Sequence, residues 1–132
     1  MVKTNSIEYS RVSTRHIVMP NHANPNGYIF GGFILGWIDL AAAMVAEKHS
    51  GMDVATVKVS EVHFKYPVKI GEHVQIEAVL ESVGTTSMVI VVEVYAEGQA
   101  IENRIHATSA SLTLVGMGKN GKPTAVPALK KI

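Results

Sequence analysis

One aspartate stands alone in the most apolar stretch of the chain. Asp39 is the only charged residue between Ile29 and Ala46. Its place in the middle of a predicted helix is unusual, because aspartate has a poor helix propensity and no capping role so far from a helix end. An unpaired carboxylate is costly to bury, and perturbed carboxylates gather at functional sites. We expect Asp39 to serve chemistry or substrate contact; the alternative is a place on a small exposed stripe of the helix.

A glycine pair, Gly31 and Gly32, begins the same helix. Glycines at a helix start allow a ligand to approach the backbone, and the first N–H groups there have no partner. Such groups can hold a developing oxyanion, although the pair could simply make a tight entry turn. Gly32 and Asp39 are two turns apart, ~10 Å along the axis. An acyl carbonyl held at the helix start could not touch Asp39 of the same helix, so the carboxylate of a neighbouring subunit is the better partner.

Polar residues on either side of the helix are further candidates. Asn24 lies in the Pro- and Asn-rich loop of residues 20–27; an amide can donate to a carbonyl oxygen or orient a water, but most loop asparagines support turns. Lys58, His63 and Lys65 lie on or near one predicted strand and could meet a phosphate. A solvated strand face explains these three side chains equally well.

The remaining composition excludes several kinds of site. The six histidines form no i, i+4 helical pair and have no carboxylate-rich surroundings, so we expect no metal. The absence of cysteine excludes a disulfide scaffold, a zinc finger and a cysteine nucleophile. No nucleophile elbow, Walker loop or G-x-G-x-x-G motif is present. A net charge of +1 gives no field suited to nucleic acid.

Length and hydrophobicity point to a single oligomeric domain. The chain has 132 residues, 47% of them hydrophobic and only 17% charged, against a typical ~25% charged. A monomer this poor in charge would have trouble covering its surface, so we expect an oligomer. No targeting segment is recognisable at the start, and a buried soluble helix explains residues 29–46 better than a membrane span. A cytoplasmic location follows as the default expectation.

The hydrophobic periodicity predicts one long helix and five strands. Tyr9–Met19 reads as a first strand, and Gly31–Ser50 reads as a helix that is apolar on nearly all sides, with Gly51 as its C′ residue. After Asp53 the period changes to two. The predicted strands there are residues 54–66, 74–81, 88–95 and 105–115, joined by short glycine-bearing links typical of antiparallel neighbours. Residues 116–132 read as a loose tail. The predicted class is α+β, with a sheet that curls around the helix.

The run from His22 to Asp39 resembles the signature of hotdog-fold acyl-CoA thioesterases, in the branch of small bacterial acyl-CoA hydrolases. The segment Val62–Glu72 resembles the strand–Pro–turn of that family, and the Gly84–Ser87 and Asn120–Lys122 segments also fit its pattern. The resemblance implies a hotdog fold over residues 1–132, a five-stranded antiparallel sheet wrapped around one long apolar helix. It further implies edge-to-edge dimers with active sites at their interface, assembled as a trimer of dimers.

The resemblance also implies roles for particular residues. Asp39 matches the catalytic acid, acting as a nucleophile or as a general base on water, and Asn24 matches an asparagine that works with it from the other subunit. Gly32 matches the backbone N–H that polarises the thioester carbonyl. Tyr28 departs from the small or acidic residue common in this branch and would lie at the mouth of the acyl tunnel. The residues expected to bind substrate are Gly31, Tyr28, Lys58, His63, Lys65 and Ser87.

Hydrolysis of acyl-CoA to a free carboxylic acid and coenzyme A is therefore the predicted function. Coenzyme A would enter as part of the substrate, and no separate cofactor is implied. The alternative is a regulatory hotdog module that binds acyl-CoA without hydrolysing it; the presence of both Asp39 and Asn24 favours the enzyme, since a binder needs neither. A dehydratase would want a histidine and a carboxylate beside the helix, and His22 lies too far before the helix start.

Overall fold

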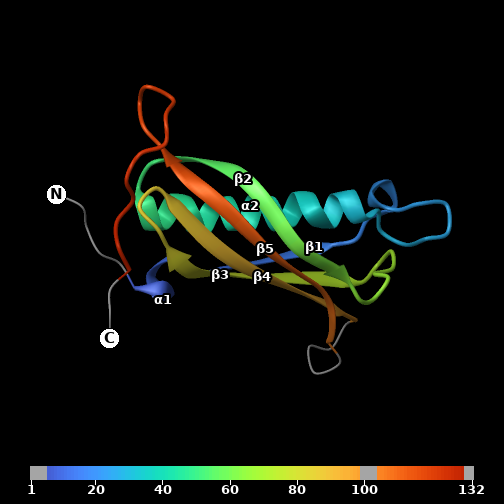
Figure 1. The fold of residues 1–132 in the computed structure, drawn as a ribbon. Helices are drawn as coiled ribbons and strands as arrows, with labels where there is room; N and C mark the ends of the chain where they lie inside the picture. Colours follow the sequence, from blue (N-terminus) through green and yellow to red (C-terminus); the bar gives the residue numbers. More distant parts are fainter. Residues whose placement is uncertain (1–5, 99–103, 130–132) are drawn as a thin grey trace.

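The computed structural model describes residues 6–98 and 104–129. Its main feature is one antiparallel sheet of five strands in the order β1-β3-β4-β5-β2 (Figure 1). Strands β3, β4 and β5 are sequential neighbours, whereas β1 and β2 form the two edges. The strands are β1 (Val12–Ile17), β2 (Asp53–Phe64), β3 (His73–Val83), β4 (Ser87–Glu97) and β5 (Ile105–Met117).

The predicted long helix is α2 (Gly31–Ser50), which lies along one face of the sheet (Figure 1). It ends at Gly51, whose φ of 70° is the left-handed conformation expected for a C′ glycine. Alternate residues of β3, β4 and β5 point at α2 and are completely buried, whereas those between them are more exposed. Ile38 and Val45 of α2 pack into this core. The α+β architecture with a sheet around one helix is confirmed.

The expectation that α2 is buried on all sides is wrong for a single chain. Phe33, Leu40 and Met44 remain 39%, 58% and 44% exposed. They share one stripe of the helix because their spacing follows the helical repeat. The sheet covers only the opposite side of α2, so apolar composition alone overstated the burial. Among the described residues, no helix is long and apolar enough to cross a membrane.

The segment expected to be a loose tail is held in place as far as residue 127. Thr124 N donates to Gly116 O at 2.8 Å, and Val126 N donates to Thr85 O at 2.9 Å. Val126 is only 4% exposed. At the end of α2, Nε2 of the buried His49 lies 2.6 Å from Pro127 O. The glycines and lysines of residues 116–132 suggested a loose tail, but the backbone turns at Gly121 and buries Val126 and Pro127.

The first residues are more helical than the sequence predicts. Ile7–Ser10 forms one helical turn, α1, because Ser6 Oγ accepts a hydrogen bond from Tyr9 N. Strand β1 consequently begins at Val12 rather than at Tyr9. The loop of residues 20–27 contains a short 3₁₀ turn over Pro20–His22. These changes leave the predicted order of the major elements intact.

Candidate active site

Asp39 lies in the middle of α2 and contacts a side chain that the sequence did not single out. The hydroxyl of Thr56, on β2, donates to Asp39 Oδ1 at 2.6 Å. The contact forms because the chain reverses after Gly51, so that β2 runs back alongside α2 (Figure 1). Asp39 itself is exposed in the single chain, as the alternative interpretation of its position anticipated. The hydrogen bond engages one oxygen of the carboxylate, Oδ1.

An apolar pocket of about 380 Å³ opens beside this pair. Asp39 and Thr56 are its polar residues; the remaining lining is hydrocarbon or glycine. The other lining residues are Leu35, Gly36, Ile38, Val59, Val62 and Leu112. A carboxylate at the wall of an apolar cavity is suited to a substrate that has a polar reacting centre and a hydrocarbon tail.

A bulge in β2 supplies part of that wall. Ser60 pairs with Ser111 and His63 pairs with Ser109, so Glu61 and Val62 together face the single residue Ala110. Glu61 takes up the extra residue with a φ of 54°. The bulge shifts the alternation of the strand by one residue, so that Val62 lines the apolar pocket as Val59 does, while Ser60 and Glu61 both face the other side of the sheet.

The start of α2 presents bare backbone to a second pocket. Phe30, the N-cap residue, makes no side-chain capping hydrogen bond. A Cβ atom on Gly32 would meet nothing within 4 Å, whereas one on Gly31 would lie 3.3 Å from the Phe64 ring. Gly31 and Lys65 both line a pocket of about 310 Å³ here. Because the first N–H groups of a helix have no intrahelical partner, the start of α2 offers backbone donors beside this pocket.

Asn24 organises its own loop through its side-chain oxygen. Oδ1 accepts hydrogen bonds from Asn26 N at 2.9 Å and from Tyr28 N at 3.2 Å, and Asn24 N donates to Tyr28 O at 2.7 Å. The amide oxygen therefore supports the turn, which leaves the side-chain NH₂ group without a partner among the described residues. No hydrogen bond joins Asn24 to Asp39 within the described part of the chain.

The residues proposed to meet phosphate do not form one cluster. Lys58 is exposed on β2, and Lys65 Nζ lies 3.3 Å from His106 Nδ1. Ser87 begins β4, where its carbonyl accepts from Gly84 N at 2.8 Å. This turn lies near the end of α2, at the opposite end of the molecule from the Asn24 loop (Figure 1).

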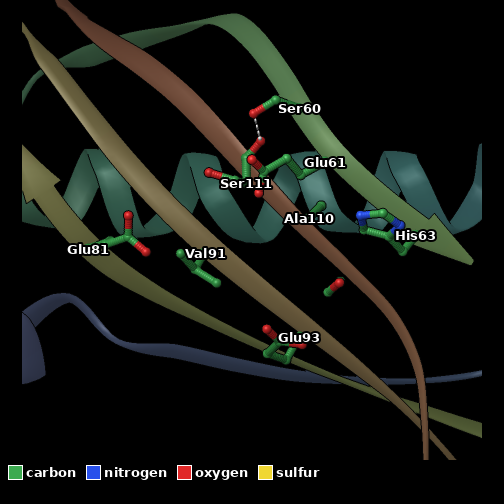
Figure 2. Close-up of a pocket in the computed structure, with 9 residues that line it drawn as sticks. Ser60, Glu61, His63, Glu81, Val91, Glu93, Ala110 and Ser111 are labelled. Atoms are coloured by element: carbon green, nitrogen blue, oxygen red, sulfur yellow. Dashed lines mark hydrogen bonds between the residues drawn. The ribbon is translucent and has the colours of Figure 1, made fainter. Parts of the chain in front are cut away.

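His63 lies in a different pocket, on the face of the sheet that points away from α2. Figure 2 shows this cavity of about 320 Å³, which serine and glutamate side chains surround. Its carboxylates belong to Glu61, Glu81 and Glu93. Three carboxylates in the pocket that His63 lines make it a poor phosphate site. Within residues 6–98 and 104–129, no three metal-ligating side chains are arranged to hold a metal ion.

Comparison with known proteins places this geometry in a family. The model of the thioesterase superfamily matches residues 26–102. The acyl-CoA thioester hydrolase YciA of Escherichia coli K12 is 34% identical over 130 residues, which are 96% of this chain and 98% of that protein. An uncharacterised acyl-CoA thioester hydrolase of Zymomonas mobilis is 35% identical over 117 residues, or 89% of this chain and 78% of its own length.

Solved structures agree with this assignment. The acyl-CoA hydrolase of Staphylococcus aureus, solved with butyryl coenzyme A and coenzyme A, superposes with a TM-score of 0.90 at 32% identity, covering 95% of this chain and 76% of its own. Structures of that enzyme also exist with an asparagine, an aspartate or a threonine replaced by alanine. An apo-hexameric acyl-CoA thioesterase gives a TM-score of 0.93 at 32% identity, covering 99% and 84%. The chain thus belongs to the thioesterase superfamily, among the relatives of YciA.

Proposed function

We propose that this protein hydrolyses acyl-CoA thioesters to a free carboxylic acid and coenzyme A. The observation that carries the proposal is the Asp39 carboxylate, held by Thr56 at 2.6 Å on the wall of an apolar pocket. The family membership and the substrate-bound relative support the same reaction. A module that only binds acyl-CoA would have no need of an oriented carboxylate beside the acyl pocket.

The proposed chemistry follows from the position of each group. The acyl chain occupies the apolar pocket, and the thioester carbonyl oxygen accepts a hydrogen bond from the Gly32 N–H of a neighbouring chain, helped by the positive end of that chain's α2 dipole. Asp39 then removes a proton from water or attacks the carbonyl carbon itself. In either route the C–S bond breaks, the acyl group gains an oxygen from water, and the thiolate of coenzyme A takes up a proton.

We further propose that each site forms between two chains. The apolar stripe of Phe33, Leu40 and Met44 is exposed on α2, and Val57 and Val59 are exposed on the edge strand β2. Burying such a surface against a second copy would extend the sheet across the dimer. Asn24 of one chain would then donate its side-chain NH₂ group at the site that contains Asp39 of the other. Hexameric relatives favour a trimer of such dimers.

Coenzyme A enters this proposal as part of the substrate. Lys65, beside the open helix start, and the exposed Lys58 are the proposed phosphate contacts. We also propose that Tyr28, whose backbone is fixed by Asn24, lies at the mouth of the acyl pocket. Ser87 is too far along the sheet to serve the same helix start, so its proposed contact requires a neighbouring chain.

The deciding experiment measures thiol release from acetyl-, hexanoyl- and palmitoyl-CoA by the wild-type protein and by Asp39→Asn. The variant preserves shape and the Thr56 contact, so it should keep its fold and oligomeric mass. We expect its turnover to fall by ~10² or more, which is typical for the loss of a positioned acid or base. Near-normal turnover by a folded variant would remove Asp39 from the reaction. If the wild type binds acyl-CoA tightly but releases no thiol, the result would contradict hydrolysis and support the alternative, a module that only binds acyl-CoA.

A further inference from the structure

His22 joins the loop that carries Asn24 to the first two turns of α2. Its backbone carbonyl accepts a hydrogen bond at 3.0 Å from Phe30 N, at the N-cap of the helix. Its ring centroid lies 5.0 Å from that of Phe33 and 5.2 Å from that of Trp37. Because Phe33 and Trp37 are four residues apart on α2, they form one surface on which the imidazole rests.

The imidazole also holds the chain that enters the loop. Met19 N donates to His22 Nδ1 at 3.0 Å, and His22 N donates to Met19 O at 2.9 Å. An imidazole nitrogen that accepts a hydrogen bond carries no proton, so the hydrogen of the neutral ring is on Nε2. One side chain thus closes the Pro20–His22 turn and packs that turn against the helix.

The two ends of the Asn24 loop are anchored differently. At the far end, Ile29 N donates to Val68 O at 2.8 Å and Ile70 N donates to Gly27 O at 3.1 Å. At the near end, Val18 exchanges hydrogen bonds with Glu72 and Gly71 before the loop begins. Within the loop, the ring contacts with α2 are made by His22, two residues before Asn24. His22 is therefore the loop residue whose contacts connect the near side of Asn24 to α2.

We propose that His22 is a positioning residue, which sets the place of Asn24 through its Nδ1 hydrogen bond and its packing on Phe33 and Trp37. This inference rests on the proposed role of Asn24 in thioester hydrolysis. His22 touches no reacting atom. Its effect on the rate arises because displacement of a participating group by about 1 Å can cost ~10² in turnover.

Two substitutions separate the hydrogen bond from the packing. His22→Phe keeps an aromatic ring against Phe33 and Trp37 but removes the acceptor for Met19 N. His22→Asn removes the ring and keeps an acceptor oxygen in the place of Nδ1. We expect His22→Phe to lower kcat by about tenfold or more with KM changed less than about threefold, and His22→Asn to recover only part of that loss, because it restores the acceptor but not the ring packing. Amide exchange at Met19 should be fast in His22→Phe and slow in His22→Asn.

A double-mutant cycle with Asn24→Ala tests whether the effect passes through Asn24. If it does, His22→Phe should cost little further activity in the Asn24→Ala background, because the group that it positions is already gone. An equal further loss in that background would overturn the inference, as would full kcat in a folded His22→Phe protein. Full activity of Asn24→Ala alone would instead contradict the proposed role of Asn24. If His22→Phe does not fold, the same cycle with His22→Asn against wild type decides whether the ring packing acts through Asn24.

Discussion

The hydroxyl of Thr56 donates a 2.6 Å hydrogen bond to the carboxylate of Asp39, although the two residues are 17 positions apart and lie on different elements. The bond orients the carboxylate at the wall of the apolar pocket. A charge-assisted hydrogen bond of this kind is stronger than a neutral one. It therefore restricts which oxygen of Asp39 can meet a substrate.

Removing the Thr56 hydroxyl should slow catalysis without disturbing the fold. Thr56→Val has nearly the same shape and lacks the donor, so we expect kcat to fall roughly tenfold, equivalent to ~1.4 kcal/mol. Thr56→Ser keeps the donor and is the matched control; it should stay within about threefold of wild type. Steady-state kinetics with one acyl-CoA measures both. Equal rates for the valine and serine variants would show that the hydroxyl does not orient Asp39.

Mixing two inactive variants should restore activity if the site is shared between chains. In a dimer of one Asn24→Ala chain and one Asp39→Asn chain, one site carries both substitutions and the other carries neither. Random exchange makes about half of the dimers mixed, so roughly a quarter of wild-type activity should return. The measurement is thiol release after joint refolding, with mixed dimers verified by differently tagged chains. No recovery in verified mixed dimers would place Asn24 and Asp39 of one chain in the same site.

A charge on the exposed stripe of α2 should break the assembly. Leu40 is 58% exposed in the single chain, and Leu40→Lys would place an ammonium group in the proposed interface, where burial is costly. Light scattering should then give a mass closer to the 14.2 kDa of one chain, and thiol release should fall with it. Leu40→Met, which keeps the apolar volume, should assemble as wild type does. An active wild-type monomer would contradict the proposed interface.

Protonation of His16 should reduce the stability of the protein in mildly acidic solution. Burial lowers the pKa of His16 below its usual 6.5, and repulsion from nearby His22, when that ring is protonated, lowers it further. The His16 ring is stacked on Trp37, with 4.3 Å between the ring centroids. Just below pH 6.5 the unfolded chain binds a proton at His16 and the folded protein does not. The contribution of the uncharged His16 ring to the free energy of unfolding is therefore present above pH 6.5 and is lost as the pH falls.

The variant His16→Phe isolates this effect because it keeps an aromatic ring on Trp37 and cannot titrate. Denaturant midpoints at pH 7.5 and pH 5.5 should differ less for His16→Phe than for the wild type. The other histidines and carboxylates are common to both proteins, so the difference between them reports on residue 16. An identical pH dependence in the two proteins would show that His16 does not contribute.

The sequence by itself was enough to predict the long helix and the central strands, and to single out Asp39 as the strongest candidate for a functional residue. Period-two alternation of hydrophobic residues predicted β3, β4 and β5, because each strand has one face in the core. The long run of apolar residues and good helix formers that ends before Gly51 predicted α2. The lone carboxylate in that run singled out Asp39. These features are local: chemical type and spacing along a few turns or a single strand are enough to reveal them.

Only the tertiary structure decided which side chains meet. Thr56 carried no distinguishing signal in the sequence, because its contact with Asp39 depends on how β2 lies against α2. The bulge at Glu61 shifts the alternation of β2 by one residue, so that Ser60 and Glu61 line the same pocket and Val62 lines the apolar one. Pairing register and bulges are set by packing between distant elements rather than by local preference. For the same reason, the proposed meeting of Asn24 with Asp39 depends on how two folded chains would pack against each other.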